Sequence, residues 1–435
     1  MTHPFSSDDV GRRMALAREW EELVAQVRDL DGFADFLKPP QLETLLPAAE
    51  RGPVVIVNVS RWRCDALIVR RDGVTAHELP GLTLDEATAR ANAYLSVLAD
   101  AEVADLRRLD AQRPRPSQAP RDAIRRRLAA SRDLEAAHQR VDEMLADLQA
   151  WMWDAIAGPV LDRLGYTETP GGEAAAWPRV WWCPTGPLTI LPLHTAGRHR
   201  DPRDGRTVLD RVVSSYTPTL RALVESRRRD DGPNTADRDL DRLLFVDVPD
   251  LPDLMPIDNS AERAALLRAF PGDRRTVLDT SEATTAAVRA ALAGHRWVHF
   301  SCHGDQDLAN PSQGGLRLRD GVLTVADITA DRFRGDFAGL SACKTAVGGV
   351  DLLDEAITLA AALHYTGYRH VIAALWSVDN HASATVFSSL YSTIAANGQL
   401  APDQAPAALH EVVRRLRDEQ PDWPHRWTPF THMGP

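Results

Sequence analysis

Three apolar segments of the sequence lead into residues capable of acid–base or nucleophilic chemistry, namely His303, Cys343 and Asp379. Apolar runs of this length are typical of buried strands in a parallel sheet. Ligands of parallel α/β sheets bind beyond the carboxyl ends of the strands. We therefore expect the three side chains to meet at one edge of a sheet if the strands are neighbours.

A cysteine and a histidine on neighbouring strand ends suit nucleophilic catalysis. A free thiol has a pKa of about 8.5 and is mostly protonated at neutral pH. The imidazole of His303 would accept the proton of Cys343, or stabilise the thiolate as imidazolium. Gly304 would let its backbone amide approach a substrate carbonyl closely, and this amide and that of Cys343 would form an oxyanion hole.

Each of these residues also has a structural explanation, and the sequence alone leaves these alternatives open. Cys343 fits a small buried apolar residue, His303 a structural histidine, and Asp379 the N-cap of a following helix. A zinc site of His299, Cys302, His303 and Cys343 is a further alternative, but residues 299 and 302 would face opposite sides of a regular strand. We favour catalysis because the three strand ends occur together, and we predict no metal and no cofactor.

The segments that position these residues alternate regularly between strands and helices after residue 241. Strands joined by helices of this length predict a mainly parallel sheet that is covered on both faces. A hairpin around Asp320-Gly321 interrupts the pattern. The predicted strands are 243–248, 276–278, 297–302, 337–342 and 370–378, and the predicted helices are 260–270, 282–293, 352–366 and 380–395.

The preceding part of the chain predicts a different arrangement of strands and long helices. A hairpin around Asp72-Gly73 and two long helices joined by a Pro- and Arg-rich loop are its main features. We predict an N-terminal helical extension over 1–45, a first subdomain over 46–226, a linker over 227–240 and a second subdomain over 241–435. The predicted elements are a helix over 12–30, strands over 52–59, 65–70, 74–79 and 180–184, and helices over 84–107 and 121–156.

Composition and charge restrict the possible classes of function. The net charge of −11 argues against a broad nucleic-acid-binding surface. No segment has the length and hydropathy of a membrane span, and no export signal is seen, so we expect a cytoplasmic protein with free thiols at Cys64, Cys183, Cys302 and Cys343. Of the 50 basic residues only Lys38 and Lys344 are lysines, a bias typical of a GC-rich bacterial genome.

Several motifs together resemble one protein family. The segments 299–304 (HFSCHG), 340–346 (LSACKTA) and 375–379 (LWSVD) are similar to those of CHAT domains, which are caspase-like cysteine peptidases related to separases. Weaker similarities at 184–193, 215–219 and 427–434 extend the resemblance over about residues 40–435.

The resemblance implies a caspase-like three-layer α/β sandwich with a mainly parallel sheet, in which an N-terminal pseudo-peptidase half precedes an active C-terminal half. It implies that His303 is the general base, Cys343 the nucleophile and Gly304 an oxyanion amide. It also implies that Asp379 lines the pocket for the residue before the scissile bond. Asp305 and Asp307, beside His303 in the sequence, are competing pocket acids.

These observations predict a cysteine endopeptidase that cleaves a partner protein. Because only about 45 residues precede the peptidase body, we expect either a stand-alone peptidase or a catalytic chain with a separate sensor or activator protein, in a bacterial signalling or defence pathway. A non-catalytic interaction module and a peptide ligase with the same dyad are the alternatives. The acids near the site predict a basic residue, preferably Arg, before the scissile bond, with a medium-sized apolar residue as the rival.

Overall fold

The computed structural model describes residues 7–30, 33, 36–113, 115, 119–199, 205–228, 241–252, 254, 256–305, 310–342, 358–376, 378 and 380–435. The chain divides into two units, Met1–Leu45 and Leu46–Pro435. In the first unit, helix α1 (Ser7–Arg28) occupies most of the predicted 12–30 segment, and α2 (Leu42–Leu45) follows. Among the described helices, none is both long and apolar enough to cross a membrane.

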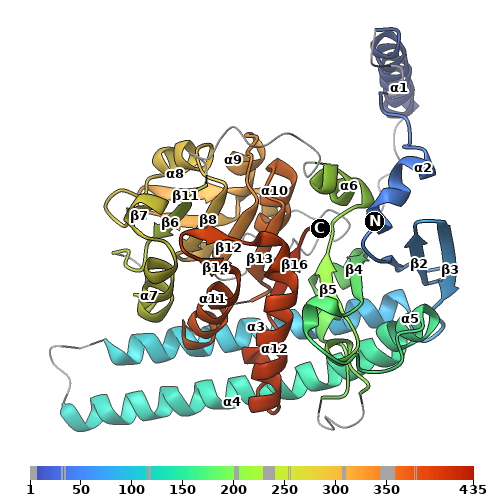
Figure 1. Cartoon of the computed structure of the whole chain (residues 1–435). Coiled ribbons are helices and arrows are strands. Elements are labelled where there is room, and N and C mark those ends of the chain that lie inside the picture. Colours follow the sequence, from blue (N-terminus) through green and yellow to red (C-terminus); the bar gives the residue numbers. More distant parts are fainter. Residues whose placement is uncertain are drawn as a thin grey trace. The chain divides into compact units, whose positions relative to one another are not determined.

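A single sheet of eleven strands runs through the described part of the second unit (Figure 1). Its order is β3-β2-β1-β4-β5-β16-β13-β12-β8-β6-β7. Strands β1, β4, β5 and β16 are parallel to one another, and β13, β12, β8, β6 and β7 are parallel to one another. The two groups meet at the antiparallel pair β13–β16 and therefore point their carboxyl ends toward opposite edges. The bounds are β1 Val54–Asn58, β2 Asp65–Arg70, β3 Gly73–Glu78, β4 Arg179–Pro184, β5 Val213–Tyr216, β6 Leu243–Asp247, β7 Arg275–Asp279, β8 Trp297–Ser301, β12 Phe337–Ser341, β13 His370–Ala374 and β16 Phe430–Met433.

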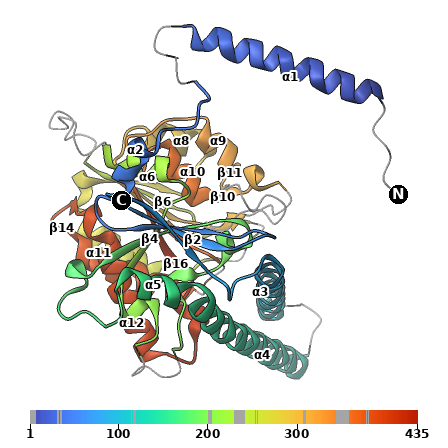
Figure 2. The same ribbon diagram turned by 90° about the vertical axis from the view of Figure 1, so that its right-hand side faces the viewer.

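Helices cover both faces of the C-terminal half of this sheet (Figure 2). Alternate residues of each strand face opposite sides, so Val298 and Phe300 of β8 pack with α8, α9 and α10, while Trp297 packs with α7, α11 and α12. Burial on both faces explains why these strands read as continuous apolar runs. The helices are α7 Ser260–Ala269, α8 Thr285–Leu292, α9 Val325–Thr329, α10 Leu359–Thr366, α11 Asn380–Ile394 and α12 Ala405–Glu419.

The N-terminal half is also covered on both faces. Val55 and Trp182 pack against α3 (Leu84–Gln112), α4 (Pro120–Met152) and α5 (Gly158–Leu164). Val54 and Trp181 pack against α6 (Leu220–Arg228). The two halves thus share one continuous sheet that is covered by helices on both faces.

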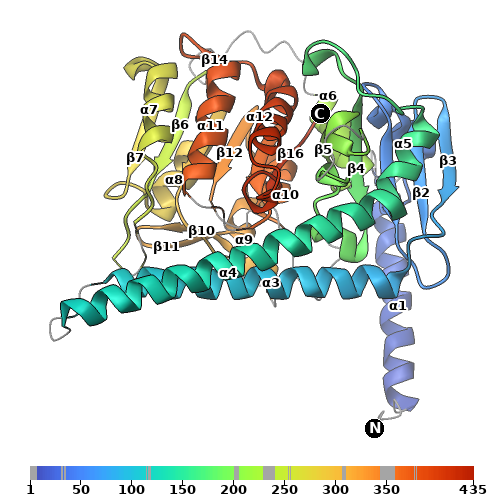
Figure 3. The same ribbon diagram turned by 90° about the horizontal axis from the view of Figure 1, so that it is seen from below.

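Helices α3 and α4 form a long antiparallel pair that starts on the N-terminal half and continues alongside the C-terminal half (Figure 3). The Thr83 hydroxyl caps α3 by accepting from the Glu86 amide at 3.2 Å. A π-helical turn, Trp153–Ala157, interrupts the continuation from α4 into α5. The sequence predicted one helix over 121–156, because no Gly or Pro within 150–157 marks the π-turn.

The two hairpins predicted from Asp-Gly pairs are confirmed. Arg70 lies opposite Gly73 in β2–β3, and Leu318 lies opposite Gly321 in the β10–β11 pair. Both glycines have positive φ angles, +147° and +157°, which other residues rarely adopt. Strand β10 spans Gly315–Leu318 and β11 spans Gly321–Thr324, and they form a small sheet with β9 (Gly304–Asp305), while β14 (Ala395–Ala396) pairs with β15 (Gln399–Leu400).

Some predicted boundaries differ from the structure. The strand predicted over 370–378 ends at Ala374, and the helix predicted over 352–366 is described only from Leu359. Strands β5 and β16 and helix α12 were not predicted as elements. Residues 227 and 228 belong to α6 rather than to the predicted linker, whose remaining residues, 229–240, lie outside the described part of the chain.

Candidate active site

The ends of the three predicted strands share one edge of the sheet. Strands β8 and β12 pair in parallel with Ser301 opposite Ser341, and β13 pairs with the other side of β12. In the sequence, His303 follows Ser301 by two residues and Cys343 follows Ser341 by two residues. Cys343 itself lies outside the described residues, so the structure places the end of its strand and not its thiol.

The small sheet β9–β11 fixes the backbone of the predicted base. The Arg317 amide donates to the carbonyl oxygen of His303 at 2.8 Å, and Gly304 lies opposite Leu316 in the β9–β10 pair. His303 is therefore held between β8, which it follows, and β9, which it precedes. Gly304, the predicted oxyanion residue, opens β9 directly after it.

The three acids predicted to line the specificity pocket are described only in part. Asp305 is the second residue of β9, and its backbone pairs with Gly315. Asp307 and Asp379 lie outside the described residues, as does the side chain of Asp305. Their role in specificity stays a prediction.

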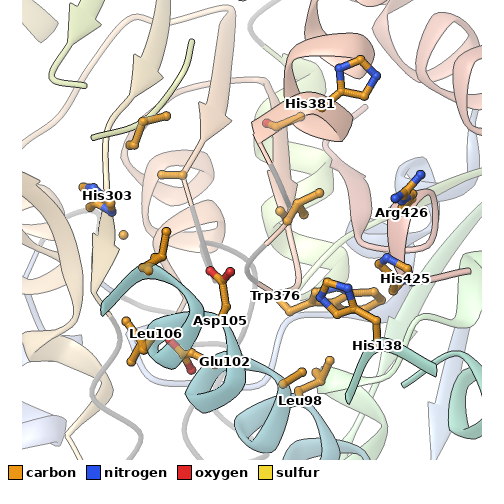
Figure 4. A pocket seen from close by; sticks show the side chains of 18 of the residues that line it. Leu98, Glu102, Asp105, Leu106, His138, His303, Trp376, His381, His425 and Arg426 are labelled. Atoms are coloured by element: carbon orange, nitrogen blue, oxygen red, sulfur yellow. The ribbon is translucent and has the colours of Figure 1, made fainter. Parts of the chain in front are cut away.

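A cleft of about 1020 Å³ opens at this edge of the sheet. His303, Gly304 and Ala342, the residue before Cys343, line it from the strand ends. Helices α3 and α4 supply the opposite side (Figure 4). Residues from both halves of the sheet line the cleft, because Trp376 follows β13 and Arg426 precedes β16.

Carboxylates of α3 line the cleft and were not identified from the sequence. Figure 4 shows Glu102 and Asp105 on the same side of α3 as Leu98 and Leu106. The Asp105 carboxylate accepts from Arg108 at 2.8 Å and is 44% exposed. The mixture of apolar and acidic residues predicts an amphipathic helix, but no local signal indicates that this helix crosses to the strand ends of the other half.

Imidazole groups gather at the other end of the cleft (Figure 4). The His138 and His425 rings stack with centroids 4.6 Å apart, and His425 Nδ1 donates to Asp142 at 2.7 Å. Arg426 lines the cleft beside them and lies over the Trp423 ring. The cleft therefore has carboxylates along α3 and cationic or titratable groups at its far end.

The alternative zinc site is not supported by the arrangement of its predicted ligands. His299 is fully buried and hydrogen-bonded to Glu262 and Tyr391, whereas Cys302 packs into the core on the opposite face of β8. Within the described ranges, no group of three or more His, Cys, Asp or Glu side chains is arranged to hold a metal ion.

Comparison with known proteins gives a family and a fold. The sequence model of the CHAT domain family matches residues 146–435. A search of the curated proteins found no match. Two structures of the Saccharomyces cerevisiae separase–securin complex are similar over 90% of this chain, with TM-scores of 0.55 and 0.56 and 10% sequence identity. This chain spans 30% and 31% of those chains, so it corresponds to less than a third of their length. A complex of the Porphyromonas gingivalis RgpB pro- and mature domains is similar over 68% of this chain and 76% of its own, with 11% identity and a TM-score of 0.42.

Proposed function

This chain belongs to the CHAT domain family and has the caspase-like fold, and from that premise we propose that it is a cytoplasmic bacterial cysteine endopeptidase. Cys343 is the proposed nucleophile and His303 the proposed general base. One observation carries the proposal. The parallel, in-register pairing of β8 with β12 brings His303 and Ala342, the residue before Cys343, to the same cleft.

The proposed reaction starts with the Cys343 thiol losing its proton to His303. The thiolate sulfur attacks the peptide carbonyl carbon and forms a C–S bond, while the carbonyl oxygen becomes negatively charged. Backbone amides of Gly304 and Cys343 are the proposed donors to that oxygen. Collapse breaks the C–N bond, and the His303 imidazolium donates its proton to the departing amine.

The second half of the proposed reaction releases the acyl group. His303 removes a proton from a water molecule, and the hydroxide oxygen attacks the thioester carbon. Breakage of the C–S bond returns the thiolate and frees the new carboxyl end. The reaction is redox-neutral, and all proton transfers pass through one imidazole.

We propose that the cleft takes an extended segment of a protein substrate with an Arg before the scissile bond. The carboxylates of Asp305, Asp307 and Asp379 support this choice from the sequence, and Glu102 and Asp105 add two carboxylates to the cleft. Arg pairs with a carboxylate through two parallel hydrogen bonds, which favours it over Lys.

We also propose that activity depends on a separate sensor or activator protein. The similar separase structures are complexes with a second protein, securin, which supports a bound partner for a chain of this fold. Segment 304–315, which follows His303, is rich in Gly, Asp, Asn and Gln, and segment 344–353, which follows Cys343, contains a Gly-Gly pair, so both sequences suit a site that a partner completes. Rapid turnover by the purified chain without any addition would contradict this part of the proposal.

Labelling with a peptidyl chloromethyl ketone tests the enzyme proposal. We expect one modification, mapped to Cys343 by peptide mass spectrometry, and none in Cys343→Ala or His303→Ala. A folded chain that is neither labelled nor able to cleave a peptide library, with or without cell extract, would be an interaction module. Transfer of the acyl group to an added peptide amine in preference to water would instead identify a ligase.

A further inference from the structure

A buried carboxylate lies beneath the strand ends that carry the proposed dyad. Glu262 belongs to α7, which packs on the face of the sheet that includes His299, and only 2% of Glu262 is exposed. A buried carboxylate without donors is costly, so its partners show what it does in the fold.

Both oxygens of the Glu262 carboxylate accept hydrogen bonds. Oε1 contacts Nε2 of His299, and Oε2 accepts from the Ser341 hydroxyl at 2.9 Å. The Ser341 hydroxyl also lies 2.8 Å from the Ser383 hydroxyl on α11. Since Ser341 donates to the carboxylate, it accepts from Ser383, and the three groups form a directed chain.

Tyr391 is a second partner of the buried imidazole. Its hydroxyl lies 2.9 Å from Nδ1 of His299, and burial together with the nearby Glu262 carboxylate raises the pKa of Tyr391 well above its usual value. Tyr391 therefore stays protonated, and the His299 ring is held on one side by the Tyr391 hydroxyl and on the other by Glu262. Gly339 makes room for this contact, because a Cβ there would approach His299 Nδ1 to 2.7 Å.

Two of the hydrogen-bonded groups occur in segments that the sequence singled out. His299 stands four residues before His303 and Ser341 stands two residues before Cys343, while Ser383 lies on α11, the helix that follows β13. One carboxylate therefore links the segments that lead to the proposed base and the proposed nucleophile. Glu262, Ser341 and Ser383 also line the cleft, and Glu262 reaches the two strands through its contacts with Ser341 and His299.

We propose that Glu262 is a positioning residue for the Cys343–His303 dyad. The inference rests on the proposed function. Glu262 ties the end of β12 to β8 through Ser341, two residues before Cys343, and His299, four residues before His303. Misplacement of reacting groups by about 1 Å can cost about 100-fold in rate, so a small shift of one strand end is sufficient for a large effect.

Glu262→Gln is the direct test, because it keeps the shape and removes one of the two acceptors. The Gln amide nitrogen is a donor and would face either the His299 Nε2 proton or the Ser341 hydroxyl. Ser341→Ala removes the hydrogen bond between β12 and Glu262. The double variant shows whether the effect of Glu262 passes through Ser341. Glu282→Gln is the control, since Glu282 is an exposed carboxylate of the same half.

The readout is the rate at which iodoacetamide alkylates Cys343, followed by peptide mass spectrometry from pH 5.5 to 9.5. This measurement needs no substrate, and it is made on the chain alone and with cell extract as a source of the proposed activator. Wild type should react through a thiolate that forms below the ordinary thiol pKa of about 8.5. Glu262→Gln should react about tenfold more slowly at pH 6.5, with its pH midpoint shifted upward by about one unit, while Glu282→Gln stays within about twofold of wild type.

The outcomes separate the inference from the proposed function. Wild-type Cys343 that titrates like an unfolded thiol, both in the chain alone and with cell extract as a source of the proposed activator, would contradict the dyad and the inference together. The inference alone fails if wild-type Cys343 is activated but a folded Glu262→Gln variant has the same alkylation rate and the same pH midpoint. It also fails if the rate losses of Glu262→Gln and Ser341→Ala multiply in the double variant. If Glu262→Gln does not fold, Ser341→Ala must itself slow alkylation about threefold or more and raise the midpoint, or the inference fails.

Discussion

The two halves of the sheet have the same layered architecture but opposite strand directions. In the C-terminal half, the carboxyl ends of β8 and β12 open onto a cleft of about 1020 Å³. In the N-terminal half, the thiol of Cys64 contacts the Ser60 carbonyl at 3.5 Å, and the thiol of Cys183 contacts the Pro218 carbonyl at 3.5 Å. Burial raises the pKa of Cys183 to about 12, so this thiol stays protonated at neutral pH.

This comparison shows that the strands alone do not create a reactive site. Both halves place cysteines near parallel strands, but only the C-terminal half follows its strand ends with a histidine at an open cleft. The C-terminal half also contains the buried Glu262 network, whose hydroxyl and imidazole groups replace apolar packing at the ends of β8 and β12. The predictions below test this difference.

The largest expected effect is loss of activity from either member of the dyad. Cys343→Ala and His303→Ala should each lower peptide cleavage about 1000-fold or more, because each step of the proposed reaction needs both groups. Cys64→Ala and Cys183→Ala are matched controls in the other half and should change the rate less than about twofold. Cleavage rates on a common peptide, with circular dichroism to show folding, give the comparison.

Near-normal cleavage by Cys343→Ala would contradict the proposal that the C-terminal half carries the nucleophile. Loss of activity in a folded Cys64→Ala variant would show that the N-terminal half participates in the chemistry.

The next effect depends on pH and concerns the β13–β16 pair, where the two halves of the sheet meet. His370 on β13 and His432 on β16 are hydrogen-bonded to each other at 3.0 Å, and His432 continues to Ser215 on β5 at 2.8 Å. Burial lowers the pKa of His370 to about 4, and burial lowers that of His432 well below 6.5. The unfolded chain therefore binds protons that the folded chain does not when the pH falls below about 6.5.

Stability should accordingly decrease as the pH falls from about 6.5 to about 4. His370 alone accounts for about 3 kcal/mol over this range, at about 1.4 kcal/mol per pKa unit. Urea unfolding at pH 7.5, 5.5 and 4.5 measures the loss, and replacing His370 with Gln should make the pH dependence shallower. A free energy of unfolding that is constant from pH 7.5 to 4.5 would contradict the conclusion that His370 and His432 are buried and neutral between β13 and β16.

A smaller effect concerns substrate preference in the active half. Asp379→Asn should lower kcat/KM for peptides with Arg before the scissile bond by about tenfold or more, and leave peptides with a neutral residue there nearly unchanged. Glu102→Gln and Asp105→Asn should cost less, since Asp105 is already paired with Arg108 and is partly screened by solvent. A positional peptide library decides the matter, and preference for Leu or Met over Arg would reject the acidic pocket.

The smallest expected effect is that of Cys302→Ala. Cys302 is 1% exposed and packs in the core beneath α8 and α10, so the change removes a small buried group at a cost of about 1 kcal/mol. Activity should remain within about threefold of wild type. A loss as large as that of Cys343→Ala would reassign the nucleophile to the neighbouring strand.

The sequence was informative where structure is local. Buried strands in a parallel sheet are continuous apolar runs, so β6, β8 and β12 were found, and the Asp-Gly pairs at 72–73 and 320–321 marked their hairpins. The caspase-like fold and the family were also predicted from the sequence and are confirmed. The roles of Cys343, Asp307 and Asp379 stay predictions, since these residues lie outside the described part of the chain.

Features that depend on distant partners were not predicted. Strand β16 has only four residues and acquires its conformation from β13 and β5, whose sequences lie far away along the chain. Glu262 reads as an ordinary exposed residue of an amphipathic helix, and only tertiary packing brings it to Ser341. The same holds for Glu102, because nothing in α3 itself indicates that it lines the cleft.

The position of β16 in the sequence also delays completion of the sheet during synthesis. Strand β5 ends at Tyr216, but the strand that joins it to the other half ends at Met433, so 217 residues must be synthesised in between. At about 5–20 residues per second, roughly 10–40 s pass in which a translated N-terminal half has an unpaired edge at β5. The nascent chain cannot complete the continuous sheet before β16 emerges, so the edge strand β5 is the place where chaperones or premature association would act during synthesis.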